Sequence, residues 1–257
     1  MYPSLATNKN YAIYDINTMD TYYDNIVPNG NICPLVNNYA YDVANSPTYI
    51  QHYEQVTIPL YERLSEALNF PVTSWNTFAQ IHDCMTVHAC HNQPIPSGVN
   101  TDLYNDVMDE FNYSYKLFYD YPTPQAAAQA GIGNLVQEIT EPMLQAISNT
   151  TNYKLLLYSG HDTTVLPFLN AFNLWNGTQW AMYASQVQLE LYLNTTSQDY
   201  YIRGAYNGEN LIFPGCTSPL CLWNTFYSYC KSIFPTETTC GAAVTHDISH
   251  FNLLARR

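Results

Sequence analysis

The dipeptide His161-Asp162 sets an imidazole beside a carboxylate at the end of a short apolar stretch. The run "LLLYSGHDTTVLPFL" covers residues 155–169, and Ser159-Gly160 interrupt its apolar pattern just before the pair. A protonated imidazole can hold a phosphate oxygen, and a carboxylic acid can protonate a leaving alcohol. Taken alone, however, the dipeptide favours a purely structural role in which it caps a helix and makes hydrogen bonds.

A strand followed by a helix is the arrangement that we expect around this pair. Leu155–Tyr158 has the length and the flanking residues of a short buried strand. Thr163 or Thr164 is a candidate N-cap for a helix that runs to about Phe172. The pair then lies at the carboxyl edge of a sheet, where open α/β sheets bind ligands and helix amides favour anions.

The sequence before this strand is predicted to be mostly helical. Ser46 and Pro47 fit the N-cap and the first helical position, and Pro59 is expected to kink the helix that follows. Its apolar stripe comprises Tyr49, Tyr53, Val56, Leu60, Leu64 and Leu68. We expect further helices in residues 74–90, 102–121 and 130–149.

The last third of the chain changes to the period of two that strands show. Apolar and polar residues alternate in "QVQLELYL", residues 186–193, and "NTTSQD" then leads into "YYIRGAY", which predicts a hairpin. We therefore expect an irregular segment over 1–45, a helical subdomain over 46–150 and part of an α/β core over 151–257.

Composition excludes several classes of partner. The 257 residues carry a net charge of -13 with only 8 Lys+Arg, so phosphate backbones and anionic membranes repel the surface. No apolar run approaches the ~18 residues of a spanning helix. Many of the 21 acidic side chains lose their charge near pH 4, which suits an acidic compartment.

Cysteines and glycosylation sequons together indicate a secretory route. There are seven cysteines, so at least one has no internal partner. The four N-x-S/T sequons begin at Asn112, Asn149, Asn176 and Asn194. The N-terminal residues do not form a signal peptide. Either the protein is not secreted, or the sequence does not begin where the native protein begins.

Several motifs resemble those of the histidine acid phosphatases, in the branched histidine phosphatase family. "YSGHDTTV" resembles the family's C-terminal signature. Further similar stretches are "NGNICPLV", "SWNTFAQIHDCMTVH", "YASQVQLELYL", "LIFPGCTSPLCLW" and "TETTC". The resemblance runs from about Asn29 to Cys240 and is most specific between Lys154 and Trp223.

The resemblance implies a fold and a reaction. The fold would be α/β, a three-layer histidine-phosphatase-like core with an inserted helical subdomain. The reaction would be hydrolysis of a small-molecule phosphate monoester through a phosphohistidine, with His161 binding phosphate, Asp162 as general acid and Trp75 lining the substrate pocket. The resemblance implies no metal or organic cofactor. It also implies a secreted or lysosomal location in an acidic compartment, and a homodimer is possible.

The same resemblance implies disulfide pairings. The implied pairs are Cys33–Cys240 and Cys216–Cys221. The family also links the cysteine matching Cys84 to one in the strand after the histidine-aspartate pair, but that strand has Gln186 instead. Cys84 then pairs with Cys90 or stays reduced, and Cys230 is expected to be unpaired.

The family's nucleophile motif is missing from this sequence. No Arg-His-Gly occurs, and Arg63, Arg203, Arg256 and Arg257 lie in no matching context. The nucleophile and the arginines are what covalent catalysis and charge stabilisation require. We therefore expect the chain to be inactive alone and to be the C-terminal portion of a longer enzyme. Its central strand would be absent, leaving Leu155–Tyr158 with unpaired backbone and exposed apolar surface.

Three other interpretations remain open. A local cluster of zinc-ligand residue types comprises His82, Cys84, His88, Cys90 and His91, but the spacing fits no common zinc finger. A second histidine-aspartate pair, His82-Asp83, suggests a metal-dependent phosphohydrolase of the class that places such pairs on helices. We disfavour this class because the pair His161-Asp162 follows a predicted strand. The chain could also be a non-catalytic secreted glycoprotein that keeps part of the phosphatase fold and binds an anion or a protein.

Overall fold

The structure, a computed structural model, describes residues 16–241 and has a mixed α/β fold, as predicted. The helices are α1 (Leu35–Ala44), α2 (Pro47–His52), the π-helix η1 (Tyr53–Thr57), α3 (Ile58–Leu68), α4 (Trp75–Cys90), α5 (Thr101–Tyr119), α6 (Pro124–Gly131), α7 (Gly133–Ile147), α8 (Asp162–Ala171), α9 (Trp223–Ser232) and α10 (Glu237–Cys240). The strands are β1 (Val187–Leu193), β2 (Tyr200–Tyr206), β3 (Glu209–Leu211) and β4 (Leu220–Leu222).

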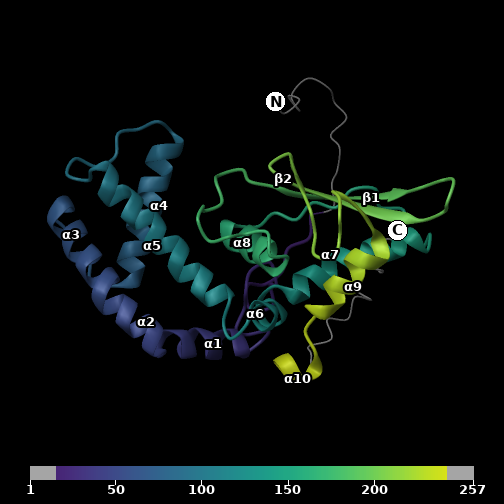
Figure 1. The fold of residues 1–257 in the computed structure, drawn as a ribbon, viewed down its shortest axis with the longest axis horizontal. Coiled ribbons are helices and arrows are strands. Elements are labelled where there is room, and N and C mark those ends of the chain that lie inside the picture. Colours follow the sequence, from purple (N-terminus) through teal and green to yellow (C-terminus); the bar gives the residue numbers. More distant parts are fainter. Residues whose placement is uncertain (1–15, 242–257) are drawn as a thin grey trace.

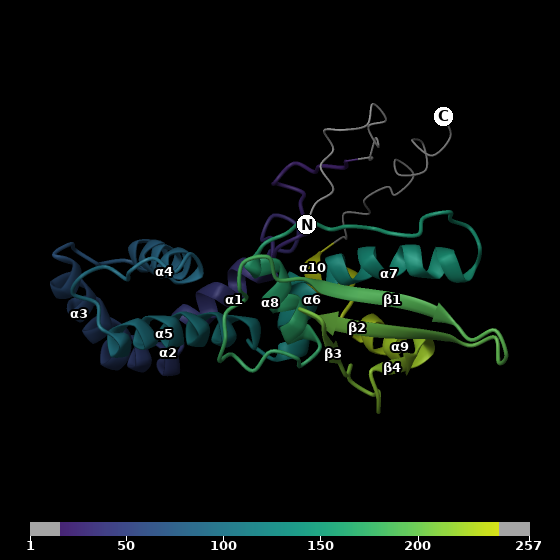
Figure 2. The same cartoon turned by 90° about the horizontal axis from the view of Figure 1, so that it is seen from above.

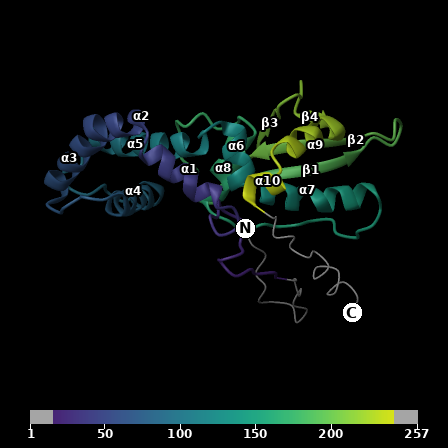
Figure 3. The ribbon, with the colours of Figure 1, turned by 90° about the horizontal axis from the view of Figure 1, so that it is seen from below.

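Helices α2–α5 and the sheet occupy opposite ends of the molecule (Figure 1). Figure 1 shows α2–α5 at one end, the sheet with α7 and α9 at the other, and α6 and α8 between them. The strands pair antiparallel in the order β1-β2-β3, with β4 also pairing with β2. The predicted hairpin is confirmed, and its turn lies at the end of the molecule far from α3 (Figure 3). None of the described helices is long and apolar enough to cross a membrane.

Helix α8 joins the two parts of the hydrophobic core. Its Leu166 and Leu169 belong to the core cluster of the helical end, with Leu64, Phe78 and Val107 among others. Its Phe168 and Ala171 belong to the cluster between the sheet and α6, α7 and α9. The start of α8 is therefore held at the junction between the helical end and the sheet.

The kink predicted at Pro59 takes the form of a π-helical turn. Proline has no N–H to donate, and the turn η1 directly precedes the helix that contains Pro59. The extra residue in this turn rotates the helix face, so Thr57 is buried whereas Val56 is 44% exposed. The prediction that Val56 lies on the apolar stripe is therefore wrong.

The prediction of an irregular segment over 1–45 is wrong for residues 35–44, which form α1. Residues 1–15 lie outside the described part of the chain. Helix α1 is rich in Asn and Tyr, and its buried residues are only Val36 and Val43. Val36 packs against Cys33 and Ala130, so tertiary contacts hold this helix rather than a strong local pattern.

Residues 130–149, expected as one helix, divide between α6 and α7 at Ile132. Gly131 and Gly133 flank this break, and glycine is a poor helix former. The glycines also allow close packing, because a Cβ on Gly133 would clash with the backbone of Ile233.

The strand predicted at Leu155–Tyr158 is not formed. No strand is assigned between α7 and α8, and this stretch runs back along α7 toward α8 (Figure 2). Leu155 is 83% and Leu157 is 89% exposed. A strand needs a neighbour to complete its backbone hydrogen bonds, and none of the described strands pairs with this stretch.

Candidate active site

His161 and Asp162 lie at the N-terminus of α8, and both are exposed. His161 is the N-cap residue, so neither threonine proposed as the cap has that place. Thr164 contributes differently, because its hydroxyl oxygen accepts the His161 backbone N–H at 3.0 Å. Gly160 leaves room for this contact, since a Cβ there would lie 2.5 Å from the same oxygen.

Two hydrogen bonds fix the carboxylate of Asp162. Its Oδ1 accepts the backbone N–H of Thr163 at 2.7 Å, and its Oδ2 accepts the indole Nε1–H of Trp180 at 2.7 Å. A negative charge is also favoured in the first turn of a helix. The side chain stays exposed, so Asp162 is oriented and still open to a ligand.

Trp180 is a site residue that the sequence analysis missed. Its ring lies 4.8 Å from that of Phe111 and 4.8 Å from that of Tyr115, and 91% of the residue is covered. A buried indole usually needs an acceptor for its N–H, and here the acceptor is Asp162. That requirement is the only signal in the sequence, and it does not say which residue is the partner.

His82 packs behind Trp180 as a buried imidazole. Its ring stacks on Phe111 at 3.6 Å and meets Trp180 edge to face at 5.8 Å. Burial lowers its pKa to about 4, although the carboxylates of Asp162 and Asp83 oppose the shift. Its Nε2 has no hydrogen-bond partner within the described residues. His82 is therefore a neutral neighbour of the site at mildly acidic pH.

The tyrosines beside the site also stay neutral. Burial raises the pKa of Tyr115, and the negative charge of Asp162 adds to the effect. The pKa of Tyr119 rises for the same main reason, with smaller contributions from Tyr115 and Asp162. Asp162 therefore faces a wall of aromatic rings that carries no compensating positive charge.

Trp75, predicted to line the substrate pocket, is separated from Asp162 by two aromatic rings. It stacks on Phe111 at 5.4 Å with an interplanar angle of 3°. Phe111 in turn contacts Trp180, which binds Asp162. The structure therefore links Trp75 to the candidate acid through two intervening rings.

The arginines of residues 16–241 are engaged elsewhere. Arg63 pairs with Asp106 at 2.6 Å, and Arg203 pairs with Glu190 at 2.6 Å. Arg256 and Arg257 lie outside the described residues. The considered zinc cluster is not assembled either, because no three His, Cys, Asp or Glu side chains of the described residues are placed so that they could hold a metal ion together.

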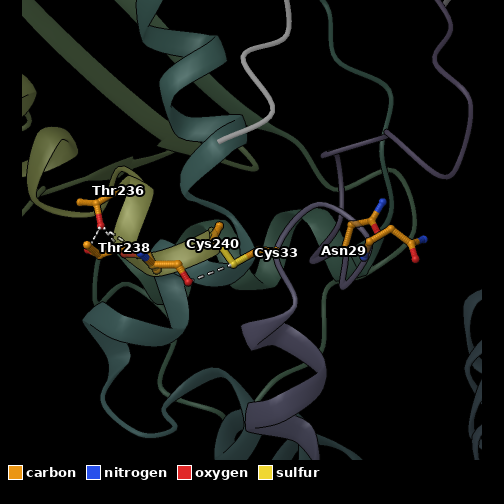
Figure 4. The surroundings of a disulfide bond; sticks show 7 residues. Asn29, Cys33, Thr236, Thr238 and Cys240 are labelled. Atoms are coloured by element: carbon orange, nitrogen blue, oxygen red, sulfur yellow. Dashed lines mark hydrogen bonds between the residues drawn. A yellow bond between two sulfur atoms is a disulfide. The ribbon is translucent and has the colours of Figure 1, made fainter. Parts of the chain in front are cut away.

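The cysteine pairs implied by the resemblance are joined in the structure. Figure 4 shows the bond between Cys33, just before α1, and Cys240 in α10. Cys216 and Cys221 form the second disulfide. The remaining cysteines, Cys84, Cys90 and Cys230, are free. Burial raises the pKa of the Cys230 thiol far above its usual range.

The sequon asparagines differ in exposure. Asn149, Asn176 and Asn194 are exposed. Asn112 is 3% exposed on α5, where its Nδ2 donates to the Met108 carbonyl at 2.9 Å.

Known proteins identify the family of this chain. The profile of the histidine phosphatase superfamily (branch 2) matches residues 4–207. The chain therefore belongs to this family, as the sequence motifs predicted.

Proteins similar to this chain include acid phosphatases. Counting factor 60 of Dictyostelium discoideum is 29% identical over 233 residues, covering 90% of this chain and 53% of that protein. Human prostatic acid phosphatase is 27% identical over 177 residues, covering 66% and 45%. Mouse lysophosphatidic acid phosphatase type 6 is 28% identical over 121 residues, covering 44% and 29%. The chain thus spans about half the length, or less, of these relatives.

A solved structure supports the fold. The phytase of Citrobacter braakii matches with a TM-score of 0.53 at 15% identity, over 88% of this chain and 72% of the phytase. At 15% identity the likeness shows a shared fold.

Proposed function

We propose that this chain carries the proton-donating part of a phosphomonoesterase site. In this proposal His161 binds a phosphoryl oxygen, and Asp162 protonates the leaving alcohol. The observation that carries it is the carboxylate of Asp162, which two hydrogen bonds orient beside His161 while it stays open to a ligand. Membership of the histidine phosphatase superfamily supplies the reaction class.

The attacking histidine and the phosphate-binding arginines come, in this proposal, from sequence beyond residues 1–257. The chain contains no Arg-His-Gly, and Arg63 and Arg203 are held in ion pairs with other carboxylates. A general acid without a nucleophile has no leaving group to protonate. Residues 1–257 alone are therefore expected to give no turnover.

The proposed substrate is a small phosphate monoester, and the proposed location is a secreted or lysosomal acidic compartment. Two disulfides and three exposed sequons support the secretory route. The excess of acidic side chains supports an acidic compartment, because self-repulsion falls as they become protonated.

The test begins with the transcript upstream of the Met1 codon. We expect in-frame sequence that encodes Arg-His-Gly-x-Arg, and hydrolysis of a phosphate monoester near pH 5 by the encoded protein. Residues 1–257 serve as the inactive control, and Asp162→Ala in the longer protein should abolish turnover. An in-frame stop codon directly upstream, or full activity of the Asp162→Ala variant, would refute the proposal.

A non-catalytic role is the second candidate. It is favoured by the absence of a free arginine near Asp162 within the described residues. In that case His161 and Asp162 keep only their structural contacts at the start of α8. The stop codon that refutes the first proposal is the result that this second one predicts.

A further inference from the structure

The outer face of the β1–β2 hairpin contains an open hollow with an aromatic wall. Tyr192 pairs across the strands with Tyr201, and Arg203 pairs with Leu220, so these side chains share one face of the sheet. Tyr192 is 44% and Leu220 is 48% exposed. The hollow has a volume of about 580 Å³. It is lined by Tyr192, Leu193, Asn194, Tyr201, Arg203 and Leu220.

Apolar surface predominates in the lining of this hollow, and Arg203, the charged side chain of that lining, is paired with the neighbouring Glu190. Arg203 donates to Glu190 Oε2 at 2.6 Å, and the Tyr192 hydroxyl donates to the same oxygen at 2.8 Å. The cation and the anion thus neutralise each other, while further donor and acceptor sites remain on both groups. Such a surface suits a neutral ligand with many hydroxyl groups better than an anion or a cation.

Asn194 lies at the rim of the hollow and begins the sequon Asn194-Thr195-Thr196. It lies directly after the last residue of β1 and two residues after Tyr192. Its side-chain oxygen accepts the backbone N–H of Thr196 at 2.9 Å and that of Ser197 at 3.2 Å. These bonds turn the amide so that Nδ2, the atom that carries N-linked sugar, has no partner among the described residues.

We propose that Asn194 carries an N-linked glycan whose first sugars lie in this hollow, with an apolar sugar face against the Tyr192 ring. The inference rests on the secretory route of the proposed function, but not on catalysis. In the attachment step Asn194 Nδ2 bonds to C1 of a lipid-linked oligosaccharide. The C1–diphosphate bond breaks, the lipid diphosphate leaves, and Nδ2 loses one proton.

The other sequons provide internal controls. Asn176 is exposed, and its side-chain oxygen accepts from the Thr178 backbone and hydroxyl at 3.0 and 2.7 Å, yet it does not line the hollow. Asn112 is buried with its Nδ2 hydrogen-bonded, and a glycan there is incompatible with the packing of α5. We therefore expect glycans at the exposed sequons Asn149, Asn176 and Asn194, and none at Asn112.

Site occupancy is the first part of the test. Residues 1–257 are secreted from a eukaryotic cell behind an added signal peptide, and peptide mass spectrometry measures the glycan at each sequon. We expect Asn194 and Asn176 to be occupied. An empty Asn194 overturns the inference, and if Asn176 is occupied in the same sample, the secretory route stands.

Release kinetics are the second part. An endoglycosidase that cuts within the core sugars should remove the Asn194 glycan from the folded protein at least about 10-fold more slowly than the Asn176 glycan, a protection of about 1.4 kcal/mol. Tyr192→Ser should abolish this difference without changing occupancy. Tyr41→Ser, at an exposed tyrosine on α1, is the control and should leave it intact. Equal release rates in the wild-type protein, or unchanged protection in Tyr192→Ser, overturn the inference.

Discussion

At the scale of single residues, the site consists of one local pair and one distant partner. His161 and Asp162 are neighbours in the chain, so the sequence alone identifies them. Trp180 reaches Asp162 from 18 residues away through an irregular loop, and no periodic pattern marks that contact. His82 is a similar case, because its burial depends on rings from α5 and from that same loop.

The depressed pKa of His82 makes stability depend on pH. Its pKa is 6.5 in the unfolded chain and about 4 in the folded protein, so the unfolded state binds the proton more tightly. The stabilisation that depends on a neutral His82 is therefore fully present above pH 6.5 and is lost as the pH falls toward 4. The loss amounts to about 3 kcal/mol in the free energy of unfolding.

Urea unfolding between pH 7 and pH 4 measures this effect. His82→Leu should lose less stability over this range than the wild type, by an amount near that figure. His91→Gln, at an exposed histidine just after α4, is the control and should follow the wild type. Parallel pH profiles for the wild type and His82→Leu would contradict a buried neutral His82.

At the scale of elements, the start of α8 presents the candidate site. The Thr164 hydroxyl satisfies the His161 backbone N–H at 3.0 Å. Thr164→Val keeps the side-chain shape and removes that acceptor, which should cost about 1 kcal/mol of unfolding free energy.

Denaturant unfolding at pH 7 tests the role of Thr164. Thr163→Val is the matched control, because the Thr163 hydroxyl makes no hydrogen bond within residues 16–241. We expect the control to stay within about 0.5 kcal/mol of the wild type. Equal losses in the two variants would show that the hydroxyl of Thr164 does not hold the helix start.

Hydrogen bonds to the buried carboxylate of Glu110 anchor the π-helical turn to α5. Glu110 Oε2 lies 2.6 Å from His52 Nε2, and the Thr57 hydroxyl donates to Glu110 Oε1 at 2.6 Å. Glu110→Ala leaves these partners unsatisfied and should cost about 1–3 kcal/mol. Asp106 lies on α5 with Glu110 and forms an exposed ion pair with Arg63 of α3. Asp106→Ala breaks this pair and should cost at most about 1 kcal/mol. Similar losses in thermal unfolding of both variants would contradict this account.

The sequence predicts those elements whose signals are local. The Ser46 cap, the helix of residues 75–90 and the hairpin all follow from residues close together in the chain. The rotation of the helix face from Val56 to Thr57 depends on the π-helical turn and on Glu110, which comes from another helix. Residue spacing along a regular helix cannot reveal such a change.

At the scale of the whole molecule, one disulfide links the two ends of the described chain. Cys33 and Cys240 are 207 residues apart, whereas Cys216 and Cys221 are 5 apart. The chain-entropy model predicts that the longer closed loop stabilises the fold by about 3 kcal/mol more than the shorter one.

Paired serine variants test this difference by thermal unfolding. Replacing Cys33 and Cys240 should lower the Tm clearly more than replacing Cys216 and Cys221. An equal fall in Tm for the two double variants would contradict the loop-length argument.

The missing strand is also a property of the whole molecule. Leu155–Tyr158 has the composition of a buried strand, yet no described strand pairs with it. Residue pattern predicts that a strand is favoured there, but only a neighbouring strand supplies the hydrogen bonds. The prediction of the site is incomplete in the same way. The sequence identifies Asp162 as the acid of the proposed reaction, but it contains no candidate for the nucleophile.

The most direct test of the proposed role of Asp162 compares leaving groups. In the protein extended by its in-frame upstream sequence, kcat/KM is measured for an alkyl phosphate and for p-nitrophenyl phosphate, with and without Asp162→Asn. An alkyl alkoxide is a poor leaving group and needs a proton from a general acid far more than p-nitrophenolate does. We predict a loss of about 10²–10⁴-fold for the alkyl ester and a much smaller loss for the aryl ester. Equal losses for the two esters, or none, would contradict the assignment of Asp162 as the proton donor.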